Sequence, residues 1–277
     1  MFDIVTGERF QRLANVYLGL AEDFEYNPLI KTDINKHKNL DTIVLPYDNP
    51  KIIFCYSHRL QLLSKKINFF TNKFVLITHN SDGNISNTTE IQTILNCAKL
   101  IVWYGQNVLM KHVKLNFIPI GMANSMWVHG DISCFKTLKI VKQSKVYMCF
   151  QINTNKNIRE SCYNLLKHKL PLLPIISHND NITRLSSYEF SICPEGNGVD
   201  THRFWESLYT KTVPIVMNNM LIQTIMETTN IPMVILNSWD EFNVNNLNYN
   251  NYDFDNIDHI QFSYYKDIIY KYQCADI

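Results

Sequence analysis

Short runs of consecutive apolar residues recur along the whole chain, and each run ends in polar residues. Apolar and polar positions do not alternate within the runs, which is the pattern of strands in a parallel sheet that is covered on both faces. We therefore expect two series of strands. They are 42–46, 51–56, 74–78, 100–104 and 116–121, followed by 145–150, 172–177, 188–193, 212–216 and 232–236.

Segments with a helical arrangement of apolar positions separate several of these strands. A chain in which strands alternate with helices forms a parallel sheet flanked by helices, so the pattern predicts the α/β fold class. The predicted helices are 57–70, 88–98, 155–168 and 200–211.

A polar stretch without strand signals, residues 129–144, separates the two series. We therefore predict two Rossmann-like domains, residues 1–135 and 136–250. The remaining segment, 251–277, contains an amphipathic helix pattern that could pack against either domain. The asparagine-rich residues 243–256 predict an irregular surface loop. In open α/β sheets the ligand lies beyond the carboxyl ends of the strands, so the residues that follow the strands are the candidate site.

The composition narrows the range of partners. With 277 residues, of which 46% are apolar, the chain can bury roughly 75% of its unfolded surface in one large domain or two compact ones. A formal net charge of +1 without a long basic run argues against nucleic acid as a main partner. The charged N-terminus and the shortness of the apolar runs argue against a signal peptide and a membrane span.

The cysteines indicate a protein of a reducing compartment. Neither the cysteines nor the histidines have the spacing of a metal site. Seven scattered cysteines, none in C-x-x-C spacing, are typical of buried thiols, so we expect a soluble cytoplasmic protein. No H-x-x-x-H, paired-cysteine or EF-hand spacing occurs in the sequence, and no metal site is predicted.

A polar cluster follows the predicted strand at 188–193. It contains Gly196 and Gly198, and glycine permits a positive φ and a close approach of a ligand to the backbone. A helix is expected to start near Asp200 or Thr201, because both residues are good N-caps. The N–H groups and the dipole at such a helix N-terminus favour phosphate.

Arg203 and Glu206 lie three residues apart on this helix and share a face, while Phe204, Trp205 and Leu208 point to the other side. An arginine can clamp two phosphate oxygens, and a carboxylate can accept both hydroxyls of a ribose. The pattern therefore favours a site for a nucleotide diphosphate attached to a sugar. The alternative is an ordinary strand–turn–helix junction with an exposed ion pair.

The segment FSICPEGNGVDTHRFWESLYTKTVPIV resembles the C-terminal signature of exostosin-like glycosyltransferases, which are related to family 47, and more distantly the corresponding segment of fucosyltransferases. The likeness extends upstream to FVLITHNSDGNI, IVWYGQN and KLNFIPIGMANSMWVHGD, and it covers the chain from about residue 50 to 240. Unlike the animal exostosins, this chain is expected to have neither a membrane anchor nor a second transferase domain. Soluble relatives of this kind occur in bacteria and large DNA viruses, so a viral chain would act in the host cytoplasm.

The resemblance implies the GT-B architecture, in which two Rossmann-like domains face each other across a cleft. The C-terminal domain then holds the donor and the N-terminal domain holds the acceptor. The implied reaction is an inverting transfer of a sugar from a nucleotide diphosphate sugar to a hydroxyl of a glycan or glycoprotein acceptor. The implied donor substrate is a uridine diphosphate (UDP) sugar, with xylose, galactose or glucuronate as the sugar, and no other cofactor is expected.

In the resembling enzymes an arginine or lysine and a glutamate of this helix hold the nucleotide sugar. This assigns the diphosphate to Arg203 and the ribose to Glu206. Arg159 would add a second phosphate contact, unless it is an ordinary exposed helix arginine. The remaining candidate donor contacts are Glu195, Gly196, Asn197, Gly198, Asp200, Thr201 and His202.

An inverting transfer needs a general base that deprotonates the attacking hydroxyl. Asp82, which follows the predicted strand 74–78, is the favoured base, and His79 is the second choice. Alternatively, Asp82 is an Asx-turn residue that stabilises the S-D-G turn. Trp127 would stack on a sugar or pack in the core, and Ser57 would line the acceptor site or cap a helix. The candidate acceptor contacts are Asn80, Ser57, His58, Asn124, Trp127 and His129.

Two other interpretations stay open. A metal-dependent transferase of the GT-A type would use Asp253 and Asp255, although this D-x-D motif lies in the asparagine-rich segment rather than at the end of a strand. A non-catalytic nucleotide-sugar or carbohydrate-binding protein would keep the donor residues and lack the base.

Overall fold

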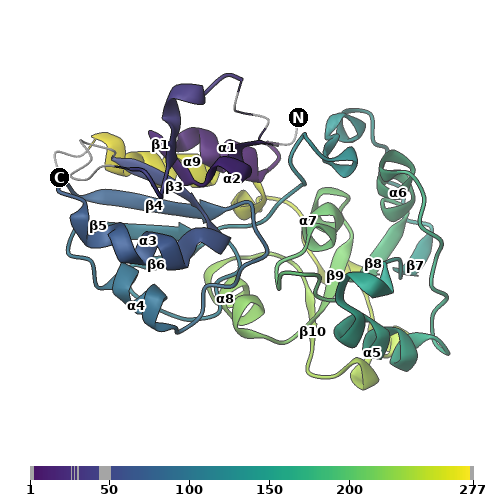
Figure 1. Cartoon of the computed structure of the whole chain (residues 1–277). Helices are drawn as coiled ribbons and strands as arrows, with labels where there is room; N and C mark the ends of the chain where they lie inside the picture. The colour runs from purple at the N-terminus through teal and green to yellow at the C-terminus, as the bar shows by residue number, and fades with distance from the viewer. Residues whose placement is uncertain (1–2, 26, 28, 30, 44–50, 275–277) are drawn as a thin grey trace. The chain divides into compact units, whose positions relative to one another are not determined.

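The computed structural model describes residues 3–25, 27, 29, 31–43 and 51–274 (Figure 1). The chain folds into two compact units, each with its own parallel sheet and flanking helices. No helix in the described part of the chain is long and apolar enough to cross a membrane. The N-terminal unit consists of Val5–Ile120, Asn124–Met126 and Phe262–Ile277, and the C-terminal unit of Met1–Ile4, Gly121–Ala123 and Trp127–Gln261.

The sheet of the N-terminal unit has six parallel strands in the order β2-β1-β3-β4-β5-β6. Every residue of β3 and β4 is buried, as expected for apolar runs that are covered on both faces. The strands are β1 Val16–Gly19, β2 His37–Asn39, β3 Ile52–Tyr56, β4 Phe74–His79, β5 Leu100–Gly105 and β6 Leu115–Phe117.

Helices cover both faces of this sheet. On one face, α3 (Leu60–Lys66) and α4 (Thr89–Leu95) pack against Ile53 and its neighbours. On the other face, α1 (Gly7–Leu13) packs against Ile52, which directly precedes Ile53 in the same strand. The alternation of neighbouring residues between two separate clusters is the reason that the strand reads as continuously apolar.

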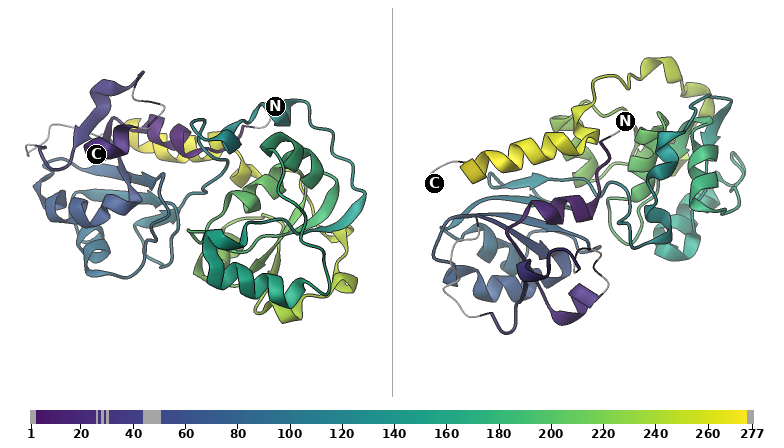
Figure 2. Two further views of the ribbon diagram at one scale, coloured as in Figure 1. Left: turned by 45° about the vertical axis from the view of Figure 1, so that its right-hand side comes forward. Right: turned by 90° about the horizontal axis from the view of Figure 1, so that it is seen from above.

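The C-terminal helix α9 (Phe262–Cys274) belongs to the N-terminal unit. Its side chains Tyr265 and Ile269 are buried in the same cluster as Phe10 of α1, and Figure 2 shows α9 running beside α1 over the sheet. The amphipathic pattern predicts this helix but not the domain that it covers, because an apolar stripe does not identify its partner. The predicted domain boundary after residue 135 lies inside the C-terminal unit.

The sheet of the C-terminal unit has four parallel strands in the order β10-β9-β8-β7. One face carries Phe190 and packs against α5 (Lys156–Leu166). The other face carries Ser191 and packs against α6 (His178–Leu185) and α7 (His202–Tyr209). The remaining elements are β7 Ser144–Tyr147, β8 Tyr188–Ile192, β9 Val213–Met217, β10 Val234–Leu236 and α8 Met220–Thr228.

Residues 172–177 are not a strand, so the prediction for this run is wrong. Pro171 and Pro174 have no N–H to donate to a ladder, and proline is tolerated poorly inside sheets. Leu173 makes one backbone hydrogen bond, to the carbonyl oxygen of Met148 at 2.8 Å. An apolar run that lacks backbone N–H donors for pairing with a neighbouring strand is therefore not enough to form a strand here.

Two strands at the edge of the N-terminal sheet are missing from the prediction. β1 has an apolar run of only four residues, and β2 consists of three polar residues. Neither therefore matches the longer apolar runs by which strands are predicted. The predicted strand 42–46 falls largely outside the described residues. These outer strands are defined by their pairing, of β1 with β3 and of β2 with β1, rather than by their own composition.

The asparagine-rich segment 243–256 contains no strand or α-helix, as predicted. Its asparagines make short turns, since the side chains of Asn243 and Asn248 accept hydrogen bonds from the N–H groups two residues ahead. The segment also buries apolar side chains, and the ring of Tyr252 lies 5.8 Å from that of Phe190. It therefore covers part of the C-terminal sheet in place of a helix.

Candidate functional site

The polar cluster predicted from the sequence lies in the turn between β8 and α7, at the carboxyl end of the C-terminal sheet. The N–H of Gly196 donates to the carbonyl oxygen of Gly198 at 3.1 Å. Neither glycine has a positive φ, so that part of the prediction is wrong; Gly121 is the glycine with a positive φ in the described residues. A Cβ atom on Gly196 would lie 3.2 Å from Nη2 of Arg159. A larger residue at position 196 would therefore require the side chain of Arg159 to shift by a few tenths of an ångström.

α7 begins at His202 with Thr201 in the N-cap position, as predicted. The side chain of Thr201 makes no capping hydrogen bond. Asp200 instead accepts a hydrogen bond from the indole Nε1 of Trp205 at 2.8 Å. The N-cap residue Thr201 thus supplies no side-chain cap, while its carbonyl oxygen accepts the N–H of Phe204 at 3.1 Å.

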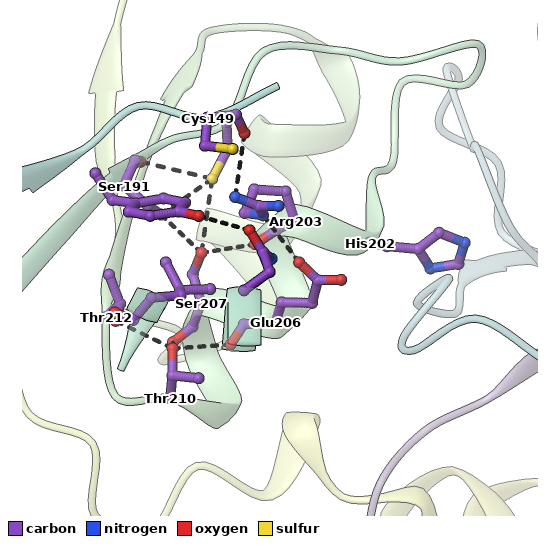
Figure 3. A network of polar contacts seen from close by, with 12 residues as sticks. Cys149, Ser191, His202, Arg203, Glu206, Ser207, Thr210 and Thr212 are labelled. Atoms are coloured by element: carbon purple, nitrogen blue, oxygen red, sulfur yellow. Dashed lines mark hydrogen bonds and ion pairs between the residues drawn. The ribbon is translucent and has the colours of Figure 1, made fainter. Parts of the chain in front are cut away.

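Arg203 and Glu206 do share a face of α7, and they are bonded to each other (Figure 3). Nε of Arg203 donates to Oε2 of Glu206 at 2.8 Å, and Nη1 donates to the carbonyl oxygen of Cys149 at 3.2 Å. The two side chains are only 20% and 8% exposed. The pair is therefore not the exposed surface ion pair of the alternative interpretation, but a largely buried one.

The charges of this pair depend on each other. Burial by itself would raise the pKa of Glu206, but the positive charge of Arg203 and the proximity of His202 hold it below its usual range. Burial would likewise lower the pKa of Arg203, and the carboxylate of Glu206 raises it. Both groups are consequently ionised at neutral pH.

Arg159 of α5 adds a second cation beside this pair. Its Nε donates to the carbonyl oxygen of Glu195 at 2.9 Å, and its Nη1 donates to that of Gln151 at 3.0 Å. Burial and the charge of Arg203 both lower its pKa. No carboxylate pairs with Arg159 within the residues described here, whereas Arg203 is paired with Glu206. The guanidinium of Arg159 is therefore not neutralised by a direct ion pair.

Tyr147 and Arg184 also belong to this region, and sequence reasoning missed both. Nη2 of Arg184 donates to the hydroxyl of Tyr147 at 3.0 Å, and that hydroxyl donates to Oδ1 of Asn181 at 2.5 Å. The guanidinium carbons of Arg184 and Arg203 lie 5.4 and 5.2 Å from the centre of the tyrosine ring. Tyr147 looks like one more apolar residue of a strand. Arg184 precedes a strand, and a search for residues that follow strands passes over it.

The other predicted donor residues are partly bonded within the turn. Oε1 of Glu195 accepts a hydrogen bond from Asn219 at 2.8 Å, whereas Asn197 is exposed. Nδ1 of His202 donates to the carbonyl oxygen of Gly121 at 2.8 Å, and its ring points away from the Arg203 pair (Figure 3). A shallow pocket opens beside the turn. Its lining includes Cys193, Glu195, Thr201, Phe204 and Asn219.

Trp127 and His129 lie near His202 in the C-terminal unit. Trp127 is 54% exposed, so the interpretation as a buried core residue is wrong. Its ring is nearly parallel to that of His129, at 16° and a centroid distance of 6.4 Å. Burial and the neighbouring His202 lower the pKa of His129. An exposed, flat aromatic surface of this kind can stack on the apolar face of a sugar.

His79 and Asn80, at the carboxyl end of β4, are part of an internal network. His79 is 2% exposed; its Nε2 donates to the carbonyl oxygen of Pro119 at 3.0 Å, and its Nδ1 accepts the N–H of Asn80 at 2.7 Å. Asn80 has a φ of 60° and bonds to the side chains of Gln11 and Asn124. Both ring nitrogens of His79 are thus occupied by the fold.

Asp82 and Ser57 lie at the same sheet edge. Asp82 is exposed, and the S-D-G turn is stabilised by Oγ of Ser81, which accepts the N–H of Gly83 at 3.3 Å, so the Asx-turn interpretation of Asp82 is wrong. Ser57 is 5% exposed and does not cap α3, whose N-cap is Arg59. The Oγ of Ser57 is buried without a hydrogen-bond partner in the part of the chain that the structure describes.

His58 is exposed, and its Nε2 lies 2.6 Å from Oδ1 of Asp23. Sequence reasoning proposed His58 only as an acceptor contact and did not single out Asp23. The two residues are 35 positions apart, and no local pattern connects them.

The D-x-D motif does not follow a strand. Asp253 accepts the N–H of Asp255 at 2.8 Å, and Asp255 is 78% exposed and lies 3.6 Å from Nζ of Lys211. Among the described residues, no group of three or more histidine, cysteine, aspartate or glutamate side chains could hold a metal ion.

In comparisons with known proteins, no protein-family model matches the chain, and no curated protein shows significant similarity to it.

Proposed function

We propose that this chain is an inverting glycosyltransferase that moves a sugar from a UDP-sugar to a hydroxyl of a glycan acceptor. The observation that carries this proposal is the guanidinium of Arg159, which has no carboxylate partner among the described residues, beside the buried Arg203–Glu206 pair at the carboxyl end of β8. This is the place where open α/β sheets bind their ligands.

A diphosphate would supply the anionic partner that Arg159 lacks. Two guanidinium groups that are partly removed from water, of which only Arg203 is paired with a carboxylate, gain from an anion that accepts hydrogen bonds from both. Arginine suits this role because its planar fork can bind two phosphate oxygens at once. In the proposal, the arginines and the N-terminus of α7 neutralise the diphosphate, and neither a metal ion nor another cofactor takes part.

Glu206 is proposed to accept the ribose hydroxyls. Its Oε2 is held by Arg203, whereas Oε1 has no hydrogen-bond partner among the described residues. Because Arg203 keeps the group ionised, Oε1 remains a hydrogen-bond acceptor at neutral pH. Arg203 would thus contact the phosphate and orient the carboxylate at the same time.

The two units are proposed to act as the two halves of a GT-B transferase, with the donor on the C-terminal unit and the acceptor on the N-terminal unit. Inversion then needs a base at the carboxyl edge of the N-terminal sheet. Of the two bases suggested by the sequence, Asp82 is exposed, while the ring nitrogens of His79 are occupied. Asp82 is therefore the better of the two candidates suggested by the sequence, and His58 is a third candidate for the base.

A thermal unfolding screen tests the donor assignment. The ligands are UDP, the three UDP-sugars, uridine and inorganic pyrophosphate, added to the metal-free protein with chelator. UDP at 100 times its dissociation constant should raise the free energy of unfolding by about 2.7 kcal/mol, and uridine should have a smaller effect because it lacks the phosphates. The absence of stabilisation by any phosphorylated ligand would contradict the proposal, and stabilisation by UDP only with manganese would favour the GT-A interpretation. Tight UDP binding without any sugar transfer would favour a non-catalytic binding protein.

A further inference from the structure

The carboxyl edge of the N-terminal sheet carries a histidine–aspartate pair. Asp23 lies on the short helix α2 (Ala21–Glu25), which follows β1, and His58 follows β3. β1 and β3 are neighbours in the sheet, so the loops after them meet. Nε2 of His58 and Oδ1 of Asp23 are 2.6 Å apart.

The fold holds the aspartate tightly. The side chain of Asp23 is 4% exposed. Its Oδ2 accepts hydrogen bonds from the N–H of Leu20 at 2.7 Å and from Nε of Arg59 at 2.8 Å. Burial alone would raise the pKa of Asp23, but the hydrogen bonds from Arg59 and Leu20 lower it below its usual range. Glu22 in turn accepts from Nη2 of Arg59 at 2.7 Å. Asp23 is therefore a fixed, ionised hydrogen-bond acceptor.

This arrangement sets the state of the imidazole. Since an ionised carboxylate can only accept, Nε2 of His58 carries the proton and Nδ1 presents its lone pair. Nδ1 has no hydrogen-bond partner within the described residues, and the side chain is 41% exposed. The ring of Tyr56 lies 5.8 Å away and limits the movement of the imidazole. An imidazole that is oriented by a buried carboxylate and open on its other nitrogen is suited to accept a proton.

Neither sequence-derived base has these properties. His79 is buried with both nitrogens occupied, and Asp82 is exposed with no residue to orient it. The turn after Asp82 nevertheless lies close to His58, because a Cβ atom on Gly83 would be 3.6 Å from the backbone nitrogen of His58. An acceptor that reaches Asp82 would therefore also meet the imidazole.

We propose that His58 is the general base of the reaction and that Asp23 is its positioning residue. The inference rests on the glycosyl transfer proposed above. The acceptor oxygen attacks C1 of the donor sugar, and the bond between C1 and the diphosphate oxygen breaks with its electron pair remaining on UDP. The acceptor proton moves to Nδ1 of His58, the resulting imidazolium is stabilised by Asp23, and the proton then leaves to solvent.

The test measures UDP release from UDP-xylose, UDP-galactose and UDP-glucuronate as a function of pH, with water and simple glycosides as acceptors. Because His58 is exposed, His58→Gln should fold normally, which thermal unfolding checks. We expect kcat to fall by about 100-fold to 10,000-fold, and the acidic limb of its pH profile to disappear. His58→Ala should recover part of the rate on addition of imidazole. Asp23→Asn should reduce kcat and shift the pH profile while UDP affinity stays unchanged, because a merely structural residue would not move the profile.

The matched control is His168→Gln, which removes an exposed histidine of the other unit and should leave both the rate and the profile unchanged. Normal turnover in His58→Gln, together with a loss of about 100-fold or more in Asp82→Asn, overturns the inference and assigns the base to Asp82. If the wild-type protein binds UDP and His58→Gln keeps the wild-type rate and profile, the inference fails while the donor assignment stands. If the wild-type protein neither binds UDP nor releases it from any donor, the proposed function fails and the inference fails with it.

Discussion

The two candidate regions differ in how far their charged side chains are exposed to solvent. At the carboxyl end of β8, Arg203 and Glu206 are largely buried and bonded to each other. At the carboxyl end of β3, His58 is exposed while its partner Asp23 is buried. A buried charge gains most from a ligand of opposite sign, because the surrounding dielectric is low. A proton acceptor must instead exchange with substrate and solvent. We therefore propose a binding role for the first region and a role in proton transfer for the second.

The largest effect is expected from breaking the buried pair. Arg203→Ala leaves Glu206 without its cation, and breaking such a pair should cost about 3–5 kcal/mol of the free energy of unfolding. Urea denaturation measures this loss. The matched control is Lys145→Ala, which breaks a more exposed ion pair with Glu189 on the same sheet and should cost at most about 1 kcal/mol. Equal losses in the two variants would mean that the Arg203 pair is solvated after all.

A smaller effect is expected from the turn that positions Arg159. In Gly196→Ala the new methyl group would lie 3.2 Å from Nη2 of Arg159, so the guanidinium must shift by a few tenths of an ångström and its hydrogen-bond geometry changes. UDP affinity should fall by about tenfold, which corresponds to about 1.4 kcal/mol. Ser161→Ala, at an exposed position of the helix α5 that carries Arg159, serves as the control for titration calorimetry. Unchanged affinity in Gly196→Ala would remove Arg159 from the donor site.

The smallest effect concerns the pH dependence of stability at the second region. Because the pKa of Asp23 is lower in the folded protein than in the unfolded chain, its stabilisation is fully present above the unfolded-state pKa. It is lost as the pH falls below the unfolded-state pKa of about 3.9 and on through the lower folded-state pKa. Asp23→Asn should therefore flatten the acidic side of the stability curve measured by urea denaturation. Asp82→Asn removes an exposed carboxylate of the same unit and should not flatten it. Identical curves for the wild-type protein and Asp23→Asn would contradict the fixed carboxylate.

The two regions also differ in how far the sequence predicts them. Arg203 and Glu206 are three residues apart, so helical spacing alone places them on one face. The pair of His58 and Asp23 depends on the adjacency of β1 and β3, and β1 has too short an apolar run to be recognised. The central strands are predicted well because they are continuously apolar. The run at 172–177 is mispredicted because Pro174 within it and Pro171 just before it remove ladder donors.

The most direct test of the account is the affinity of UDP for Arg159→Met, measured by titration calorimetry beside the wild-type protein. Methionine relieves the repulsion between Arg159 and Arg203 but removes two hydrogen bonds to backbone carbonyls, so urea denaturation first checks that the variant is folded. If the guanidinium of Arg159 binds the diphosphate, UDP affinity should fall by about 10-fold to 100-fold, as expected for loss of a charged hydrogen bond. The affinity for uridine should not change. Equal affinities of the two proteins for UDP, or an equal loss for UDP and uridine, would contradict the proposed donor site.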